Sequence, residues 1–332
     1  MYYKGVYHLF YQHNPLAATF GDIIVWAHSV SYDLINWIHL NIALEPSGPY
    51  DINSCWSGSA TILPGEKPAI LYTGIDHNKN EVQNLAIPKN LTDAFLREWE
   101  KHPQNPVMTP PSGVEEDNFR DPSTAWHGKD GKWRVIVGAQ NGDEGKTILY
   151  QSEDFVNWIV NPNPFFATDN TGVCECPDFF PVYINSTNGV DTSVDNSSVR
   201  HVLKISYLRK QHDYYFLGKY VSDKEKFVPD VEFTGTSKDL RFDYGKFYAS
   251  KSFFDYAKNR RILWGWVNES DSTQDDIEKG WAGLQVIYCN SMFSLIILVS
   301  TRLRYILKNV EPCQLSLSHY QYSEIILGIG KC

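Results

Sequence analysis

The 332-residue sequence predicts an all-β fold, a five-bladed β-propeller, from three observations. Short β-branched or aromatic runs, such as HVLKISY, WRVIVGA, ILYTG and RILWGWV, are bounded by turn residues, as strands are. Hairpin signals, with Gly between two strand-like runs, recur in YYKGVY, LPGEKPA and HGKDGKW. Polar motifs, finally, stand at wide intervals along the chain, each ahead of such a hairpin.

These polar motifs define a repeat. They begin at Trp56 (WSGS), Arg120 (RDP), Glu175 (ECPD) and Phe242 (FDYG). The intervals between them exceed the about 40–50 residues of common propeller repeats, so long loops are expected. Inner strands of a propeller gather their tips around one central channel, which would bring the motifs together.

The opening hairpin, MYYKGVYHLFYQHN, has the same form but no polar motif before it. The repeat therefore predicts that the first inner strand is missing from this end. Helical patterning is scarce by comparison. We expect one short helix within residues 90–103, capped by Asn90 or Thr92.

The composition suits a β-rich fold or a sugar-binding surface and argues against several other classes. Aromatic residues make up 14% of the chain, and such rings either stack on the apolar faces of sugars or fill a β-rich core. The formal charge of −9 argues against nucleic acid or an anionic membrane as the partner. The spacing of the six cysteines matches neither a metal site nor a dense disulfide framework, so we predict no metal and no cofactor.

Four Asn-x-Ser/Thr sequons indicate a secreted glycoprotein. They lie in polar, turn-rich contexts at Asn90, Asn185, Asn196 and Asn268. The N-terminus MYYKGVYHLFYQ shows no charged leader, apolar run and small-residue cleavage site. We therefore expect a secreted protein whose signal peptide is absent from this chain.

Taken together, the motifs resemble those of glycoside hydrolase family 32, the plant cell-wall invertases and fructan exohydrolases. They are WSGSAT from Trp56, FRDP from Phe119, ECPDF from Glu175 and DYG from Asp243, together with FYQ and WAHS nearer the start. The resemblance runs from Met1 to about Gln285. It implies a five-bladed propeller followed by a β-sandwich, a cell-wall or apoplastic location, and sucrose or a fructan as substrate.

The resemblance also implies roles for individual residues. Glu175 matches the family's acid/base, Asp121 its transition-state stabiliser, and Arg120 a residue that contacts sugar hydroxyls and a neighbouring carboxylate. Two carboxylates about 5 Å apart are what a retaining glycosidase needs. Without the other motifs, a buried salt bridge would explain Asp121 and Arg120 equally well, and a turn contact would explain Glu175.

Further residues match the walls of the family's fructose pocket. Phe20 replaces a tryptophan of many invertases, and the alternative for Phe20, Tyr244 and Tyr248 is simple core packing. The full set of expected substrate-binding residues is Gln12, Phe20, Trp56, Ser57, Arg120, Tyr244 and Tyr248.

Three departures from the family pattern shape the expectation of activity. The family nucleophile is the Asp of an Asn-Asp-Pro-Asn-Gly motif just upstream of the residues that match MYYKG, so none of the 332 residues is assigned that role. Val173-Cys174 replaces the usual Met-Trp before Glu175. Leu208 and Gln211 stand where invertases carry an acidic residue and a lysine that hold glucose, which favours an exohydrolase over an invertase.

Two functional hypotheses therefore remain. The first is a β-fructofuranosidase or fructan exohydrolase, with this chain itself nearly inactive, and the second is a catalytically dead sugar-binding relic or decoy. We expect a propeller domain over residues 1–285, an incomplete last blade, no β-sandwich, and an out-of-family tail over 286–332. The apolar run within that tail is short for a membrane span. We expect a monomer.

Overall fold

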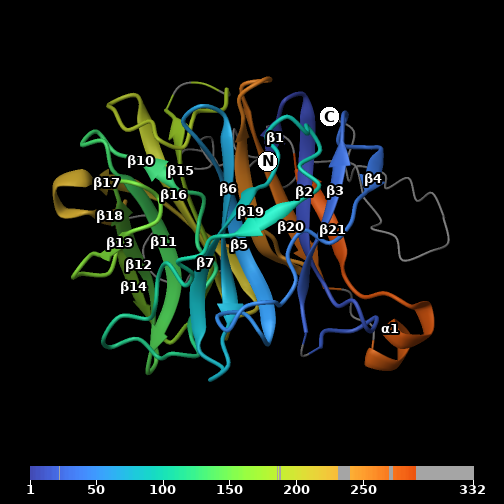
Figure 1. Cartoon of the computed structure of the whole chain (residues 1–332). Helices are drawn as coiled ribbons and strands as arrows, with labels where there is room; N and C mark the ends of the chain where they lie inside the picture. Colours follow the sequence, from blue (N-terminus) through green and yellow to red (C-terminus); the bar gives the residue numbers. More distant parts are fainter. Residues whose placement is uncertain (22, 185, 187, 231–239, 269–271, 289–332) are drawn as a thin grey trace.

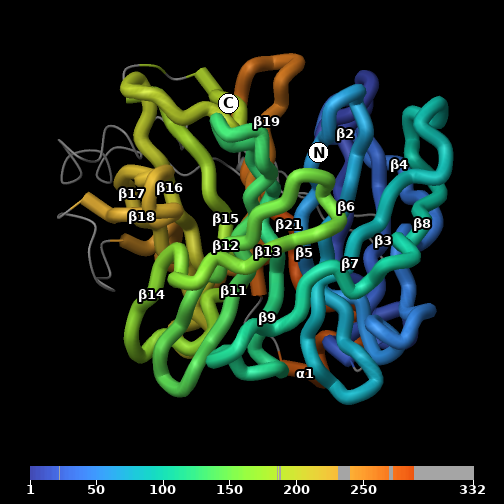
Figure 2. The backbone as a smooth tube through the Cα atoms, turned by 60° about the vertical axis from the view of Figure 1, so that its left-hand side comes forward, coloured from blue at the N-terminus to red at the C-terminus, as the bar shows by residue number. Residues whose placement is uncertain are grey.

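The computed structural model describes residues 1–21, 23–184, 186, 188–230, 240–268 and 272–288. Five antiparallel sheets follow one another along this part of the chain and stand side by side around the molecule (Figures 1 and 2). The predicted all-β, five-bladed propeller is confirmed. Its strands, sheet by sheet, are β1 (Tyr2–Tyr3), β2 (Val6–His13), β3 (Val25–Ser31) and β4 (Trp37–His39); β5 (Ser54–Leu63), β6 (Lys67–Ile75), β7 (Glu81–Pro88) and β8 (Trp99–Lys101); β9 (Phe119–Arg120), β10 (Trp126–His127), β11 (Trp133–Asn141), β12 (Glu144–Ser152), β13 (Trp158–Val160) and β14 (Phe166–Asp169); β15 (Cys174–Tyr183), β16 (Val199–Tyr207), β17 (His212–Val221) and β18 (Lys226–Pro229); and β19 (Phe247–Asp255), β20 (Arg260–Val267) and β21 (Leu284–Tyr288).

In four of the sheets the strands pair in chain order, because short turns connect antiparallel neighbours, and in the third sheet β14 instead pairs with β12. β1 takes the first place in its sheet, as β5, β15 and β19 do in theirs. The position of the first inner strand is thus occupied by the two residues of β1, Tyr2 and Tyr3. In the third sheet, β9 and β10 share that place, and both pair with β11.

The hydrophobic core lies between neighbouring sheets rather than at one centre. One cluster of buried side chains joins the first and second sheets, and another joins the second and third. A larger cluster runs from the third sheet through the fourth to the fifth. A fourth cluster joins the fifth sheet back to the first, so the ring of contacts is continuous.

The contact between the first and last sheets is also polar. The hydroxyl of Tyr7 on β2 donates to Asp255 Oδ2 at the end of β19, at 2.8 Å. Arg260 on β20 lies 3.0 Å from the same carboxylate and donates to the Tyr7 oxygen at 3.1 Å. We call these three residues the seam triad.

The helix expected within residues 90–103 is wrong. Asn90 Oδ1 accepts hydrogen bonds from the backbone N–H and hydroxyl of Thr92, and Asp93 accepts from Phe95 N at 3.0 Å. Such local side-chain contacts compete with helical bonds, and Leu96 adopts a positive φ of 46°. The segment therefore forms turns that lead into β8.

In the described ranges, the named helical elements are the 3-10 turn Ser222–Lys224 and α1 (Thr273–Lys279). α1 begins with a capping box between Ser272 and Asp275 and ends at Gly280, which has φ 80°. This Ser-x-x-Asp signal was present in the sequence.

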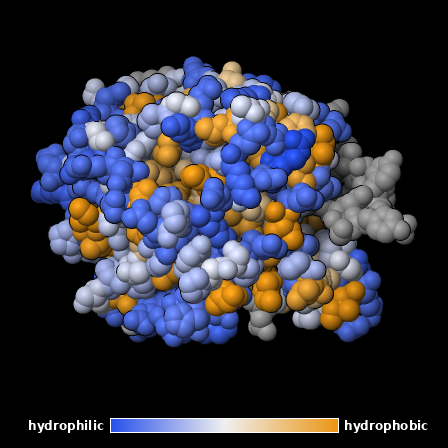
Figure 3. Space-filling view, in the orientation of Figure 1, coloured by the Kyte–Doolittle hydropathy of each residue, from blue (hydrophilic) through white to orange (hydrophobic). Residues whose placement is uncertain are grey.

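The face shown in Figure 3 is largely hydrophilic, with apolar side chains scattered over it. Among the described residues, no helix is long and apolar enough to cross a membrane. The tail expected from residue 286 lies outside the described residues from 289 onward, and β21 ends at 288. The boundary at 285 stays a prediction.

Candidate active site

The inner strands of four sheets, the second to the fifth, deviate from regular pairing, and this irregularity builds the site. β5, β15 and β19 each shift register, and in the third sheet the inner strand breaks between β9 and β10. Such bulges bend a strand and turn its side chains in new directions. The last paired residues before the irregularity are Trp56, Arg120, Glu175 and Tyr248.

Three residues within these irregularities have strained backbones. Asp121 has φ 66°, Cys176 has φ 45° and Ala249 has φ 53°, and the first two each precede a proline. Non-glycine residues in this region cost about 1–3 kcal/mol and persist only where the surroundings enforce them. One such enforcing contact is buried Lys204, whose Nζ donates to the carbonyl of Cys176 at 2.8 Å.

A second buried lysine binds the freed carbonyls of two blades. Lys251, on β19, donates from Nζ to the backbone oxygens of Pro122 at 3.0 Å, Asp121 at 3.2 Å and Pro177 at 3.4 Å. It also reaches the Ser59 hydroxyl on β5 at 3.1 Å. One ammonium therefore connects the inner strands of four sheets beneath the site.

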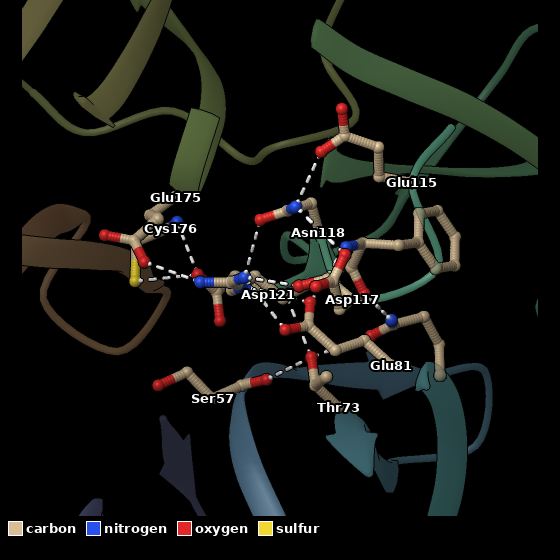
Figure 4. Close-up of polar contacts among 12 residues, drawn as sticks. Ser57, Thr73, Glu81, Glu115, Asp117, Asn118, Asp121, Glu175 and Cys176 are labelled. Atoms are coloured by element: carbon tan, nitrogen blue, oxygen red, sulfur yellow. Dashed lines mark hydrogen bonds and ion pairs between the residues drawn. The ribbon is translucent and has the colours of Figure 1, made fainter. Parts of the chain in front are cut away.

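Glu175 lies between a cation and a hydroxyl. Its Oε1 is 3.0 Å from Arg120 Nη1, and its Oε2 accepts a 2.6 Å hydrogen bond from Tyr248 (Figure 4 labels Glu175). Burial raises the pKa of Glu175, and the charge of nearby Asp121 adds to the effect, whereas Arg120 and Tyr248 oppose both. A carboxyl group with a raised pKa can hold a proton for a leaving group.

Asp121 lies against the strand that carries Glu175. Its Oδ2 accepts from Cys176 N at 2.8 Å, and its own N–H donates to Thr73 Oγ1 at 2.8 Å (Figure 4). The Thr73 hydroxyl lies 3.0 Å from the carbonyl of Ser57. The second, third and fourth sheets are thus linked through one residue, Asp121, which bonds Thr73 with its backbone N–H and Cys176 with its carboxylate and is 4% exposed.

Arg120 contacts two carboxylates of the site, those of Glu175 and Glu81. Besides Glu175 it contacts Glu81 on β7, with Nη2 2.8 Å from Oε1 and Nε 2.9 Å from Oε2. The Trp56 ring lies beside its guanidinium, at 5.4 Å from the ring centroid. Arg120 thus forms a buried salt bridge with Glu81, as the structural alternative expected of Arg120, and also contacts Glu175.

The remaining expected binding residues lie at the edges of this cluster. Gln12 is exposed and donates to the carbonyl of Cys55 at 3.3 Å, next to Trp56. Phe20 is 78% exposed and Tyr244 57% exposed, so core packing describes neither side chain. Tyr248 is 7% exposed and contacts Glu175, as described above.

The expected specificity residues, Leu208 and Gln211, occupy the turn between β16 and β17. Leu208 donates its N–H to the carbonyl of Val173 at 3.3 Å, and Gln211 donates to the carbonyl of Leu208 at 2.7 Å. The turn therefore packs beside the segment that leads into Glu175. Sequence reasoning missed Glu81 and Lys251, which belong to no motif. Their one signal was a charged residue within a strand-like run, at the start of β7 for Glu81 and in the middle of β19 for Lys251.

No three His, Cys, Asp or Glu side chains gather as a metal site in the described part of the chain. Cys55, Cys174 and Cys176 are buried free thiols. Cys174, which replaces the family's tryptophan, is fully buried in the largest hydrophobic cluster. The predicted absence of a metal and a cofactor stays a prediction.

A propeller whose inner strands bring together a carboxyl group with a raised pKa, an arginine and a second carboxylate has the kinds of residue that a glycosidase uses. The chain belongs to glycosyl hydrolase family 32, because residues 1–290 match the model of that family's N-terminal domain. The resemblance read from the motifs is confirmed.

Individual relatives point the same way. The chain is 59% identical over 291 residues to an insoluble β-fructofuranosidase isoenzyme of Arabidopsis thaliana, covering 86% of this chain and 52% of the relative. It is 56% identical over 291 residues to a fructan 6-exohydrolase of Beta vulgaris, covering 86% and 48%. The crystal structure of fructan 1-exohydrolase IIa from Cichorium intybus matches with a TM-score of 0.83 and 61% identity, covering 86% and 53%. The chain spans about half the length of these relatives.

Proposed function

We propose that this chain forms the propeller of a retaining β-fructofuranosidase, which releases terminal fructose from sucrose or a fructan. The observation that carries the proposal is the placement of Glu175 between Arg120 and Tyr248, beside buried Asp121. Glu175 would protonate the glycosidic oxygen as its bond to the fructose anomeric carbon breaks. Glu175 would later take a proton from the water that attacks the anomeric carbon and releases fructose from its ester with the enzyme nucleophile. Asp121 would bind fructose hydroxyls as positive charge develops on the ring.

The scheme needs a second reactive carboxylate. Asp121 accepts the Cys176 N–H and Glu81 is bound by Arg120, so neither is placed to attack an anomeric carbon. We propose that the nucleophile comes from an Asn-Asp-Pro-Asn-Gly segment ahead of the residues that match MYYKG. No such pentapeptide occurs in the 332 residues.

The test compares the 332-residue chain with a version extended at its N-terminus by that segment. We expect no detectable fructose release from sucrose or inulin by the 332-residue chain, and release by the extended one. Loss of a nucleophile from a concerted set usually costs many orders of magnitude in rate. Turnover by the unextended chain that Glu175→Gln abolishes would contradict the assignment.

We further propose that fructan ends are preferred to sucrose. Leu208 and Gln211 offer no carboxylate or ammonium to a glucosyl group, and the turn they occupy packs beside the Glu175 strand. A structure of the Cichorium intybus enzyme contains 1-kestose. The active extended chain should show a higher kcat/KM on inulin or levan than on sucrose, and much faster cleavage of sucrose would remove the argument.

The alternative, a catalytically dead sugar-binding relic or decoy, gains no support from the comparisons, because the relatives named above are enzymes. We propose a monomer of the cell wall or apoplast that binds neither nucleic acid nor membrane; relatives described as insoluble or cell-wall isozymes support the location.

We also propose that sequon asparagines carry glycans. Asn90, Asn196 and Asn268 are exposed, and in the first two the residue two positions on donates its hydroxyl to the asparagine Oδ1. Asn185 lies outside the described residues. Glycopeptide mass spectrometry of chain secreted from a eukaryotic host tests these sites.

A further inference from the structure

Glu81 is a buried carboxylate that the acid/base assignment leaves without a role. It opens β7, on the sheet next to the one that carries Arg120, and is 2% exposed. Its Oε2 accepts from Phe119 N at 2.8 Å and from Arg120 Nε at 2.9 Å, while its Oε1 lies 2.8 Å from Arg120 Nη2. This two-point contact fixes the plane of the guanidinium.

The fixed plane decides what Arg120 can do for Glu175. With Nε and Nη2 committed to Glu81, and Nη2 also to the carbonyl of Asp117 at 2.9 Å, the Nη1 group points to Glu175 Oε1. One cation is therefore shared by two carboxylates. Figure 4 shows Glu81 and Glu175 on opposite sides of the cluster of dashed contacts.

We propose that Glu81 is a positioning residue that, through Arg120, sets the protonation of Glu175. An anionic Glu81 takes up much of the Arg120 charge, so the proton on Glu175 is retained to higher pH. A neutral residue at position 81 leaves the whole charge facing Glu175 and favours its ionised form. The catalytic meaning of this coupling rests on the proposed function.

Other charges surround the pair and set its working range. Burial raises the pKa of Glu81 to about 7, and the charge of Arg120 opposes this shift. The charge of Glu81 therefore changes near neutral pH, and with it the share of the Arg120 charge that acts on Glu175. Asp121 disfavours the ionised form of both. The titratable groups that face Glu175 and its strand from neighbouring elements are Arg120, Asp121, Tyr248, Lys204 and Lys251, and Cys174 and Cys176 flank Glu175 on its own strand.

The experiment measures the Glu175 carboxyl directly, in the 332-residue chain, so it requires no turnover. The chain is labelled with 13C at the glutamate carboxyls, and the Glu175 resonance is identified by its loss in Glu175→Gln. Its titration is then followed by NMR in the wild type, in Glu81→Gln, and in Glu116→Gln. Glu116 is exposed, so its replacement makes the same charge change outside the contact.

Glu81→Gln should lower the Glu175 midpoint by about half a pH unit or more, and Glu116→Gln should leave it unchanged. The wild-type Glu175 curve should show a second inflection where Glu81 titrates, because interacting sites share macroscopic steps. A Glu175 curve in Glu81→Gln that superimposes on the wild type, or a shift matched by Glu116→Gln, overturns the proposal.

If Glu81→Gln does not fold, as judged by circular dichroism, the wild-type curve decides alone. A single-step Glu175 titration then overturns the coupling. Failure of the extended chain to release fructose would count against the proposed function and would leave this titration intact.

Discussion

Tyr248 controls the same proton from the opposite side. Its hydroxyl donates to Glu175 Oε2 at 2.6 Å, and the hydrogen bond stabilises the ionised carboxylate. Arg120 and Tyr248 thus restrain a pKa that burial raises. The carboxyl group is poised by opposing contacts rather than by one.

Replacing Tyr248 by Phe should therefore raise the Glu175 midpoint, by about one pH unit, because a donor to the charged form is lost. The direction is opposite to that expected for Glu81→Gln. Carboxyl NMR measures it, with Tyr32→Phe, at a 64% exposed tyrosine, as the matched control. A midpoint that falls would show that the hydroxyl does not stabilise the carboxylate.

A second residue-scale feature is the pair His8 and His28. Their rings lie within the first sheet, with His8 Nδ1 3.0 Å from His28 Nε2, and both are almost fully buried. Burial lowers the pKa of His8 to about 2 and that of His28 to about 3. The unfolded chain binds protons at these sites near pH 6.5, so it gains protons first as the pH falls.

Stability should accordingly be full above pH 6.5 and decline below it. Each histidine contributes a loss of about 2 kcal/mol by pH 5. Urea unfolding at pH 7.5 and 5.0 measures the decline, which should be smaller in His8→Gln. His77→Gln, at an exposed site, should retain the full decline. Equal slopes in all three proteins would remove the pair as the cause.

At the scale of the elements, the bulges of the inner strands depend on buried lysines. Lys251 satisfies three carbonyls that have left the ladder, and burial lowers its pKa. A methionine of similar length would leave those carbonyls buried without a donor, at about 1–3 kcal/mol for each group left unsatisfied.

Lys251→Met should lower the free energy of unfolding by about 3 kcal/mol. Chemical denaturation measures the loss, and Lys219→Met, at an exposed position of β17, should change it little. A loss in Lys251→Met no larger than in the control would show that water or another donor serves the carbonyls.

Strands and hairpins were predictable because their periodicity and turn residues are local. The polar motifs of the sequence also predicted that Trp56, Arg120 and Glu175 lie on inner strands, as they do. Glu81 and Lys251 could not be found this way, since their partners are distant in sequence and depend on how blades meet. The expected helix failed because Asn90 and Asp93 bind their own backbone.

Over the whole molecule, stability depends on the closure between the last sheet and the first. The seam triad joins residues 248 positions apart, and the adjoining cluster packs β2 against β20 and β21. Asp255 is fully buried, with Tyr7 and Arg260 as its partners.

Asp255→Ala should destabilise the entire ring by about 3 kcal/mol, because it removes the buried carboxylate that Tyr7 and Arg260 both contact. Hydrogen exchange should rise in β2 and β20 together. Asp223→Ala, in the exposed 3-10 turn, serves as the control. Faster exchange confined to β20 would show that the two sheets open independently.

The strand irregularities have a consequence for how such a molecule can change its chemistry. Each of four blades presents one side chain just before its bulge, while the layers of packing and the lysines lie elsewhere. The side chains of Trp56, Arg120, Glu175 and Tyr248 therefore come from four different strands of a shared frame and contact one another. Replacing one of them changes the surroundings of its neighbours, whereas the lysines that hold the bulged backbone can stay as they are.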